Sequence, residues 1–213
     1  KRIVNKNNSK FKVNAHIYQK KENKKNSKLM DEIVVTTDSQ KYLNLIKKYK
    51  LNFSVKRSKH LSGDYIQDFP VIKDALLKSE IFFEKTFDYI ILLRPTSPLR
   101  EANLIKNSLT ILHKNKKSHS VRAVQKVKQH SYRQWKYDKK KIFIISVTKD
   151  INEPYNLPRQ KLPNFSFQTG DIETIKRSTI IKGSISGKNV LPIFIRKKYY
   201  DIDNPEDLKS FKK

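Results

Sequence analysis

The sequence predicts an α/β protein with a three-layer, Rossmann-like arrangement, in which helices cover both faces of a mostly parallel mixed sheet. Three observations predict it. Short apolar, β-branched runs such as 33–37 and 88–93 lack polar alternation, which is typical of strands covered on both faces. Segments in which apolar residues recur at helical spacing separate these runs. Such strand–helix alternation favours parallel strands joined by crossover helices.

The elements follow one another along most of the chain. The predicted strands cover residues 33–37, 53–55, 88–93, 120–127, 170–175 and 190–195. The predicted helices cover residues 40–49, 68–83 and 101–113, and a last helix begins near Pro205 with Asn204 as its N-cap. In the second helix, we expect an inward face of Val71, Ile72, Ala75, Leu76 and Leu77.

Two segments depart from this alternation. Residues 135–167 loosen into short strands and a proline-containing loop, which we interpret as a hairpin-like excursion within a single domain, 1–213, and as a place for a subunit contact. Residues 20–28 (KKENKKNSK) offer no apolar face, so they form either a solvated helix or a segment that has lost its packing.

The composition bounds the function. The net charge of +27 suits nucleic-acid binding. However, only nine of the 47 basic residues are arginine, and the lysines are scattered along the chain. The codon bias of an A+T-rich genome therefore explains the lysine excess better. We therefore expect no specific nucleic-acid partner. No cysteine supplies a disulfide or thiolate metal site, and no apolar run has the length of a membrane span. Because no signal peptide is visible, we expect a cytoplasmic protein without membrane association.

The first candidate site follows the 88–93 strand. Arg94 and Arg100 bracket a turn that contains two prolines and the hydroxyls of Thr96 and Ser97. Ligands of open α/β sheets bind beyond the carboxyl ends of the strands, and two cations beside two hydroxyls suit a phosphate or carboxylate. The alternative is a proline-stiffened connection with two solvated arginines.

The second candidate site is Asp201-Ile202-Asp203. In an extended chain, both carboxylates face one side while Ile202 anchors the other. Two such carboxylates can hold Mg²⁺, which commonly takes one or two carboxylates together with substrate phosphates. The alternative is a surface segment whose acids offset the nearby Arg196, Lys197 and Lys198.

Matching pieces in order along nearly the whole chain resemble the acylneuraminate cytidylyltransferases, which make CMP-sialic acid and its legionaminic and pseudaminic relatives. The pieces are KRIVNKN, DEIVVTTDS, the spaced Arg57, Leu61 and Asp64, LLRPTSPLR, PRQKLP, the Gly170 turn and DIDNPEDL. LLRPTSPLR followed by DIDNPEDL is the specific combination. QTGDIETIKRSTII is similar to the branch that acts on legionaminate-like sugars.

The resemblance implies a nucleotidyltransferase fold and a reaction in which CMP passes from CTP to the anomeric hydroxyl of a nine-carbon 2-keto sugar acid, with release of pyrophosphate. It implies Mg²⁺ as the cofactor, held by Asp201 and Asp203, and a homodimer. Lys6, Asp201 and Asp203 fall on catalytic positions. The implied nucleotide-binding residues are Arg2, Asn7, Arg57 and Ser97, and the implied sugar-acid-binding residues are Arg94, Arg100, Arg159, Gln160 and Gly170. Asp38 and Asp64 match family positions that are either functional or structural.

The chain also departs from the family. It starts at or just after the lysine of a Gly-rich loop that cradles the CTP phosphates, so we expect a truncated or processed chain that lacks that loop and the first central strand. Val4 stands where the family usually has proline, and Arg94 where many members have glutamine. Thr169 stands in place of the family's usual asparagine, and Glu173 in place of a common tyrosine. Two other hypotheses stay open: an impaired homologue that binds nucleotide or a partner subunit, and a basic nucleic-acid-binding protein. A sister enzyme for an eight-carbon acid is disfavoured because this chain has RPTSP at the turn.

Overall fold

The computed structural model describes residues 13–19, 30–48, 53–101, 103–137, 142–144, 151–197, 199–204, 206, 207 and 209. The chain divides into two compact units, of which unit 1 comprises residues 1–123 and 169–213 and unit 2 comprises residues 124–168. Helices and strands both contribute to unit 1, so the α/β prediction is confirmed. The expected excursion at 135–167 falls within unit 2, and its role in a subunit contact stays a prediction.

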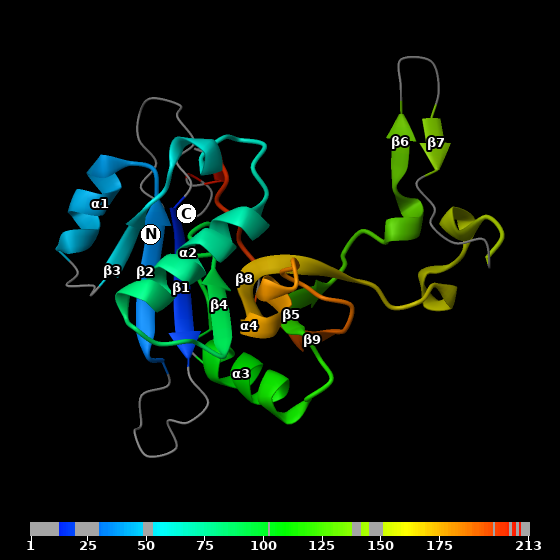
Figure 1. Ribbon diagram of the computed structural model, residues 1–213. Coiled ribbons are helices and arrows are strands. Elements are labelled where there is room, and N and C mark those ends of the chain that lie inside the picture. Colours follow the sequence, from blue (N-terminus) through cyan, green and yellow to red (C-terminus); the bar gives the residue numbers. More distant parts are fainter. Residues whose placement is uncertain are drawn as a thin grey trace. The chain divides into compact units, whose positions relative to one another are not determined.

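The main sheet has the strand order β3-β2-β1-β4-β8-β5-β9 (Figure 1). Its strands are β1 (Val13–Gln19), β2 (Glu32–Thr37), β3 (Phe53–Lys56), β4 (Tyr89–Leu93), β5 (Ser120–Lys126), β8 (Ser166–Lys176) and β9 (Val190–Phe194). The predicted strands are thus confirmed, to within a few residues at their ends. In the pairing of β4 with β8, Leu92 lies opposite Glu173.

The sheet is mixed, but the prediction that it is mostly parallel is wrong. β2 and β3 pair in parallel, whereas β1–β2, β1–β4 and β4–β8 are antiparallel. Much of the difference arises at β1, a strand that the sequence analysis did not assign, although Val13, Ala15 and Ile17 alternate with polar or aromatic residues. An antiparallel neighbour needs no crossover helix, and the polar residues 20–28 offer no apolar face for one.

Four helices flank the described sheet: α1 (Gln40–Lys47), α2 (Asp68–Phe82), α3 (Leu104–Lys114) and α4 (Arg177–Ile181). The Ser39 side chain caps α1 by accepting the N–H of Tyr42. Helix α4, a short helix directly after β8, was not predicted from the sequence. On α2 the predicted inward face is confirmed except at Leu77, which is exposed.

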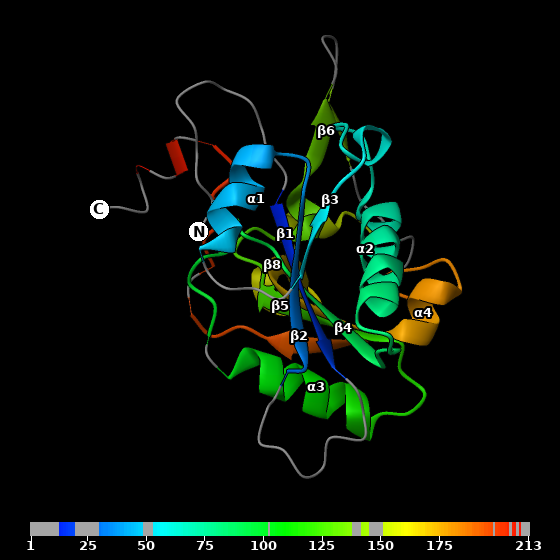
Figure 2. The same cartoon turned by 60° about the vertical axis from the view of Figure 1, so that its left-hand side comes forward.

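Two cores lie on opposite faces of the sheet, because neighbouring residues of a strand point to opposite sides. Tyr89 and Ile91 of β4 pack in the cluster that contains Leu104, Leu109 and Leu112 of α3. Ile90 and Leu92 pack in the other cluster, with Ile72 and Leu76 of α2 and Ile180 of α4. Figure 2 shows α2 and α4 on one side of the sheet and α3 on the other. The apolar 88–93 run is therefore covered on both faces, as predicted.

Unit 2 carries a small antiparallel pair, β6 (Trp135–Tyr137) and β7 (Ile142–Ile144). Aromatic rings hold its turns together. His130, Tyr132 and Phe165 pack edge to face, and His130 Nε2 lies 2.9 Å from the Pro163 carbonyl oxygen. Among the described residues, the short 3-10 turns are Lys59–Leu61 in unit 1, and Ser131–Arg133, Pro154–Asn156 and Arg159–Lys161 in unit 2. No helix in the described parts of the chain combines the length and the apolar character needed to cross a membrane.

Candidate nucleotide and sugar-acid site

The turn after β4 is fastened to β8 by arginine side chains. Ser97 donates its N–H to the Arg94 carbonyl at 3.2 Å, which closes the turn. Arg100 donates from Nη2 to the Arg94 carbonyl at 2.8 Å and from Nε to the Asp171 carbonyl. Burial lowers the pKa of Arg100, while Asp171 and Tyr199 oppose that shift. Arg100 therefore acts as a brace between the turn and β8, and it is not the solvated arginine of the alternative interpretation.

Arg94 lies among acidic side chains. Its Nε and Nη2 donate to Oε1 of Glu173 at 3.2 and 2.8 Å, and Nη2 also donates to Oδ2 of Asp68 at 2.6 Å. Burial lowers the pKa of Arg94, but Glu173 and Asp68 outweigh burial and raise that pKa above its ordinary value. Arg122 of β5 lies 3.0 Å from the other Glu173 oxygen. A single buried carboxylate thus joins β5, β8 and the turn.

Gly170 lies inside β8 and not in a turn of its own, as the sequence analysis expected, and it packs against the turn after β4. A Cβ atom there would stand 2.7 Å from Ser97 Oγ, 3.0 Å from Tyr199 Oη and 3.2 Å from Arg94 Cδ. The Gly170 N–H donates to Tyr199 Oη at 2.9 Å. Burial raises the pKa of Tyr199, so its hydroxyl stays protonated well beyond neutral pH. The structure requires glycine here because three side chains converge on the backbone.

The acidic pair is held beside the same turn. The Ile202 N–H donates to the Thr96 carbonyl at 2.9 Å, and Ile202 is only 5% exposed. Asp201 and Asp203, on either side of it, are exposed. Ile202 is therefore the buried anchor that the sequence predicted. That both carboxylates face one side stays a prediction.

A reciprocal cap fixes the other side of the pair. Oδ1 of Asn204 accepts the Asp207 N–H at 2.8 Å, so the predicted N-cap is confirmed. Oδ2 of Asp207 accepts the N–H of Asn204 at 3.0 Å and that of Asp203 at 2.9 Å. This is the logic of a capping box, in which side chains at both ends satisfy otherwise unpaired N–H groups. The backbone of the pair is therefore tied on both sides of Ile202.

Comparison with known proteins identifies the chain at this point. The sequence profile of a family described as Cytidylyltransferase matches residues 1–140, well over half of the 213 residues.

The chain belongs to the cytidylyltransferase family.

Three relatives are similar to this family member. Post-translational flagellin modification protein B of Campylobacter coli is 30% identical over 187 residues, which cover 87% of this chain and 77% of that protein. CMP-N,N'-diacetyllegionaminic acid synthase of Campylobacter jejuni is 40% identical over 73 residues, 34% of this chain and 31% of the enzyme. Pseudaminic acid cytidylyltransferase of Campylobacter jejuni is 31% identical over 110 residues, 51% of this chain and 46% of the enzyme. The alignments with the two enzymes span less than half of each enzyme.

Cytidylyltransferases are typically Mg²⁺-dependent, and the acidic pair of this cytidylyltransferase chain fits that ion. Asp201 and Asp203 supply hard carboxylate oxygens from an exposed and doubly tethered segment. Mg²⁺ commonly takes one or two protein carboxylates and completes its shell with water and substrate phosphates, so two acids suffice. The described residues form no group of three or more potential metal-binding side chains.

The structure brings together only some of the predicted residues of this cytidylyltransferase. One group of predicted residues meets at the turn after β4, through the contacts given above. It consists of Arg94, Ser97, Arg100, Gly170 and the pair Asp201 and Asp203. Lys6, Arg2 and Asn7 lie outside the described residues. Arg159 and Gln160 belong to unit 2, where Arg159 Nη2 donates to the Val127 carbonyl at 3.2 Å.

Arg57 is placed differently from the other predicted site cations. It is 3% exposed and donates from Nη2 to the Thr36 carbonyl at 3.1 Å. Burial lowers the pKa of Arg57, and the charges of Asp38, Asp68 and Asp74 oppose this shift. Asp38 thus contributes to the electrostatics of a buried arginine at the ends of β2 and β3. A nucleotide contact by Arg57 stays a prediction.

Sequence reasoning missed four residues of the site: Asp68, Arg122, Asp171 and Tyr199. It noted Glu173 only as a departure from the family. A signal was present, because Asp171 and Glu173 alternate with Ile172 in a predicted strand, and acids buried in a sheet need cationic partners. The sequence did not indicate which of the nine arginines would be the partners.

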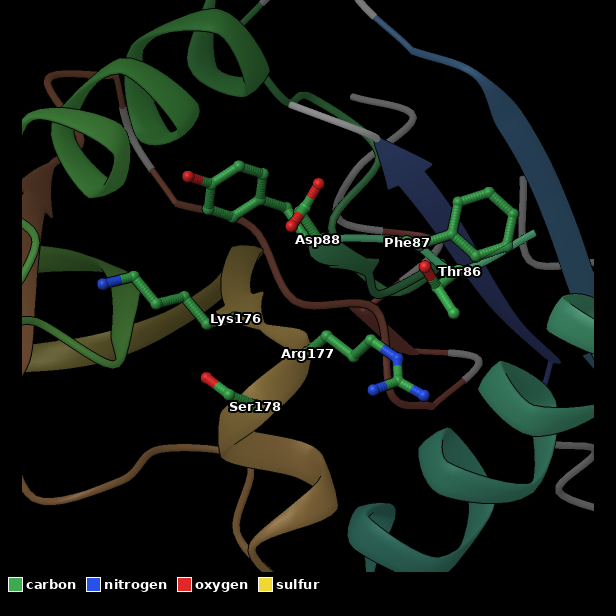
Figure 3. Close-up of a pocket in the computed structure, with 7 residues that line it drawn as sticks. Thr86, Phe87, Asp88, Lys176, Arg177 and Ser178 are labelled. Carbon is green, nitrogen blue, oxygen red and sulfur yellow. The ribbon is translucent and has the colours of Figure 1, made fainter. Parts of the chain in front are cut away.

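A separate pocket lies at the opposite end of β4. Thr86, Phe87, Asp88, Tyr89, Lys176, Arg177 and Ser178 line it (Figure 3). The side chains of Lys176 and Arg177 extend in opposite directions in this view. Arg177 is held by Glu80 at 2.7 and 2.9 Å, and Lys176 Nζ donates to the Lys116 carbonyl at 2.6 Å. These two cations are thus engaged by the protein and do not converge on one ligand.

Proposed function

We propose that this protein transfers CMP from CTP to the anomeric hydroxyl of a nine-carbon 2-keto sugar acid and releases pyrophosphate. The sugar acid is of the sialic, legionaminic or pseudaminic type, a class that includes the acids in the names of two relatives. The fold that goes with this proposal is the Rossmann-like nucleotidyltransferase fold. The single observation that carries it is the tether of the acidic pair to the turn after β4, the Ile202 N–H on the Thr96 carbonyl.

The chemistry assigns roles to the clustered residues. The reaction brings a triphosphate and a carboxylate into one site, so it needs a cation for the phosphates and donors for the sugar acid. Asp201 and Asp203 are the residues that would hold Mg²⁺, which supplies charge neutralisation for the α-phosphate and the leaving pyrophosphate. Ser97, Arg100 and Gly170 shape the turn beside this pair, and Arg94 supplies N–H donors. A hydroxyl nucleophile and a phosphate leaving group require positioning and charge stabilisation above all.

Residues beyond this cluster complete the proposal. Lys6, Arg2 and Asn7 are proposed to bind CTP, with the Asn7 amide reading cytosine by both donating and accepting hydrogen bonds. Arg159 and Gln160 of unit 2 are proposed to face the sugar acid. The proposed homodimer uses the 135–167 excursion, and light scattering of the purified protein measures it directly.

The test is a pyrophosphate-release assay with CTP, Mg²⁺ and each of the three acids, with CMP-sugar detection by mass spectrometry. Two forms are compared: residues 1–213, and the same chain with a family strand and Gly-rich loop fused ahead of Lys1. We expect release that requires CTP, the acid and Mg²⁺ together. UTP in place of CTP is the control for nucleotide choice. If neither form turns over any of the acids, the proposal is wrong.

Calorimetric titration of the protein with CTP distinguishes an active transferase from an impaired homologue. An impaired homologue binds CTP but releases no pyrophosphate in either form. Salt-resistant, sequence-selective binding to DNA or RNA would instead favour the nucleic-acid-binding hypothesis, since scattered lysines support only weak, salt-dependent adsorption.

A further inference from the structure

The hydroxyl of Tyr199 joins strand β8 to the acidic pair. Its oxygen accepts the Gly170 N–H at 2.9 Å. A Cβ atom at position 170 would lie 3.0 Å from the same oxygen, so the phenol reaches the strand because residue 170 is glycine. Tyr199 precedes Asp201 by two residues, just ahead of the Ile202 tether. The backbone of β8 thus fixes a hydroxyl group next to a proposed metal ligand.

The Tyr199 hydroxyl serves Asp201 as a hydrogen-bond donor. Burial raises the pKa of Tyr199, and Asp201 raises it further through its charge and a side-chain hydrogen bond, while the Gly170 N–H opposes the shift. The phenol therefore keeps its proton at neutral pH. An ionised carboxylate only accepts hydrogen bonds, and the Gly170 N–H already occupies the phenol oxygen as a donor. The O–H is consequently directed to Asp201.

Asp201 is exposed, so packing does not select the orientation of its carboxylate. An exposed side chain samples several staggered rotamers, and only some of them present an oxygen to a cation beside the pair. Hydrogen bonds from groups outside the ligand shell restrict ligands in this way, and their loss typically lowers metal affinity about 10- to 100-fold. The bond from Tyr199 has the chemistry and the location for this task.

Other contacts hold the backbone of this segment. The Ile202 N–H donates to the Thr96 carbonyl, and Asp207 accepts the N–H of Asp203. Loss of the Tyr199 hydroxyl should therefore free the Asp201 side chain more than it moves the chain. This separates a positioning role, which shows in cation affinity, from a structural role, which shows in stability.

We infer that Tyr199 is a positioning residue whose hydroxyl, held by the Gly170 N–H, donates to the Asp201 carboxylate and orients it to receive Mg²⁺. This inference rests on the proposed function, because it takes Asp201 as a ligand of that ion. Tyr199 acts on the cation through Asp201, so its loss should weaken the metal site without altering recognition of the nucleotide or the sugar acid.

Four variants test the inference: Tyr199→Phe, Asp201→Asn, the double variant, and Tyr89→Phe. Phenylalanine keeps the ring and removes only the hydroxyl. Tyr89 is the matched control, because it is 3% exposed and its hydroxyl lies 3.3 Å from His113 Nδ1, away from the acidic pair. Thermal unfolding reports the stability of each variant, and all titrations use a temperature at which the variant is folded.

Two metal probes report on the site without turnover. Mn²⁺ takes the same oxygen ligands as Mg²⁺, and its electron paramagnetic resonance signal counts the free ion during a titration. Tb³⁺ also binds carboxylate oxygens, and tyrosine excitation sensitises its luminescence when the ring is close to the ion. Because the chain has ten tyrosines, the change between parent and variant is the quantity compared.

We expect Tyr199→Phe to lower Mn²⁺ affinity about tenfold and to remove most of the sensitised Tb³⁺ luminescence. The Mg²⁺ concentration for half-maximal pyrophosphate release should rise about tenfold, and excess Mg²⁺ should restore kcat. KM for CTP and for the sugar acid, measured at saturating Mg²⁺, should stay within about twofold of the parent. In the Asp201→Asn background, Tyr199→Phe should add no further loss. Tyr89→Phe should change none of these metal readouts.

Two results would overturn the inference and leave the transferase proposal intact: parental Mn²⁺ affinity in Tyr199→Phe, or additive losses in the double variant. Lower stability of Tyr199→Phe with unchanged metal affinity is the first of these, and it would make the tyrosine structural. If the parent turns over no acid, the two metal titrations still decide. Parental Mn²⁺ affinity in Asp201→Asn would refute both the inference and the metal role of the pair in the proposed function.

Discussion

The backbone N–H of Ile202 donates to the carbonyl oxygen of Thr96 at 2.9 Å, which ties the C-terminal acidic pair to a turn about a hundred residues earlier in the chain. Because Ile202 is buried, its neighbours Asp201 and Asp203 are presented to solvent on either side of this bond. The relationship gives two acids, far apart in sequence from the Arg94 turn, a fixed place beside it.

Removal of either carboxylate of the pair should abolish metal-dependent turnover with little effect on folding. We expect Asp201→Asn and Asp203→Asn each to lower kcat by about 100-fold or more, because the cation that offsets phosphate charge loses a ligand. Unfolding temperatures should stay close to that of the parent, since both side chains are exposed. Pyrophosphate release against Mg²⁺ concentration measures the effect. The control is Glu206→Gln, an exposed acid nearby, and an equal loss in that variant would contradict the assignment.

A methyl group at Gly170 should disrupt the site. Gly170→Ala places a Cβ 2.7 Å from Ser97 Oγ and 3.0 Å from Tyr199 Oη, so the turn must shift. We expect a loss of about 1–3 kcal/mol in the free energy of unfolding and weaker binding of the sugar acid. Gly63→Ala is the matched control, because its Cβ meets only Ile66 Cγ1, at an ordinary 3.5 Å. Chemical denaturation compares the two variants, and equal behaviour of both would refute the close-packing argument.

Loss of the Asp207 carboxylate should loosen the acidic pair. Asp207→Ala removes the acceptor of the N–H groups of Asp203 and Asn204, which we expect to cost about 0.5–2 kcal/mol of local stability. The Mg²⁺ concentration for half-maximal turnover should rise severalfold, because the ligands are less well positioned. Asp207→Asn keeps an acceptor oxygen and should recover part of the loss. If Asp207→Asn behaves like the alanine variant, the carboxylate acts through its charge and not as a cap.

Asp171 should make stability fall as pH rises. Burial raises the pKa of Asp171 above its ordinary value of 3.8, with Arg100 opposing the shift. An acid whose pKa is higher in the folded state binds its proton more tightly there. At a pH between the two pKa values, the unfolded chain has therefore lost the Asp171 proton while the folded chain still retains it. In this range the free energy of unfolding falls steadily as pH rises. Above the folded pKa this cost is complete.

The Asp171→Asn variant tests this sign. We expect its unfolding temperature, relative to the parent, to be higher at pH 7 than at pH 3.5, because asparagine removes the cost of ionising a buried acid. Thermal unfolding across this range is the measurement, with Glu84→Gln as an exposed-acid control. A difference between variant and parent that does not change with pH, or that becomes less favourable as pH rises, would contradict the prediction.

Local patterns determined much of what was predicted correctly. The apolar run 88–93 specified a strand covered on both faces, because each of its residues needs burial whichever way it points. Asn204 specified a helix N-cap through short-range hydrogen bonding. The spacing of Asp201, Ile202 and Asp203 specified one buried side chain between two exposed acids. These features depend on residues a few positions apart, so the sequence contains them directly.

The tertiary structure alone decided the strand directions and the charge partners. β1 lies antiparallel between β2 and β4, and no local signal determines which neighbours a strand selects. Glu173 joins Arg94 and Arg122, and Arg57 is buried against Thr36, because these partners are 21 to 79 residues apart and meet only when the sheet forms. Periodicity reports which face of an element is apolar. Which charged groups meet is set by long-range packing, where desolvation forces each buried acid to find a cation.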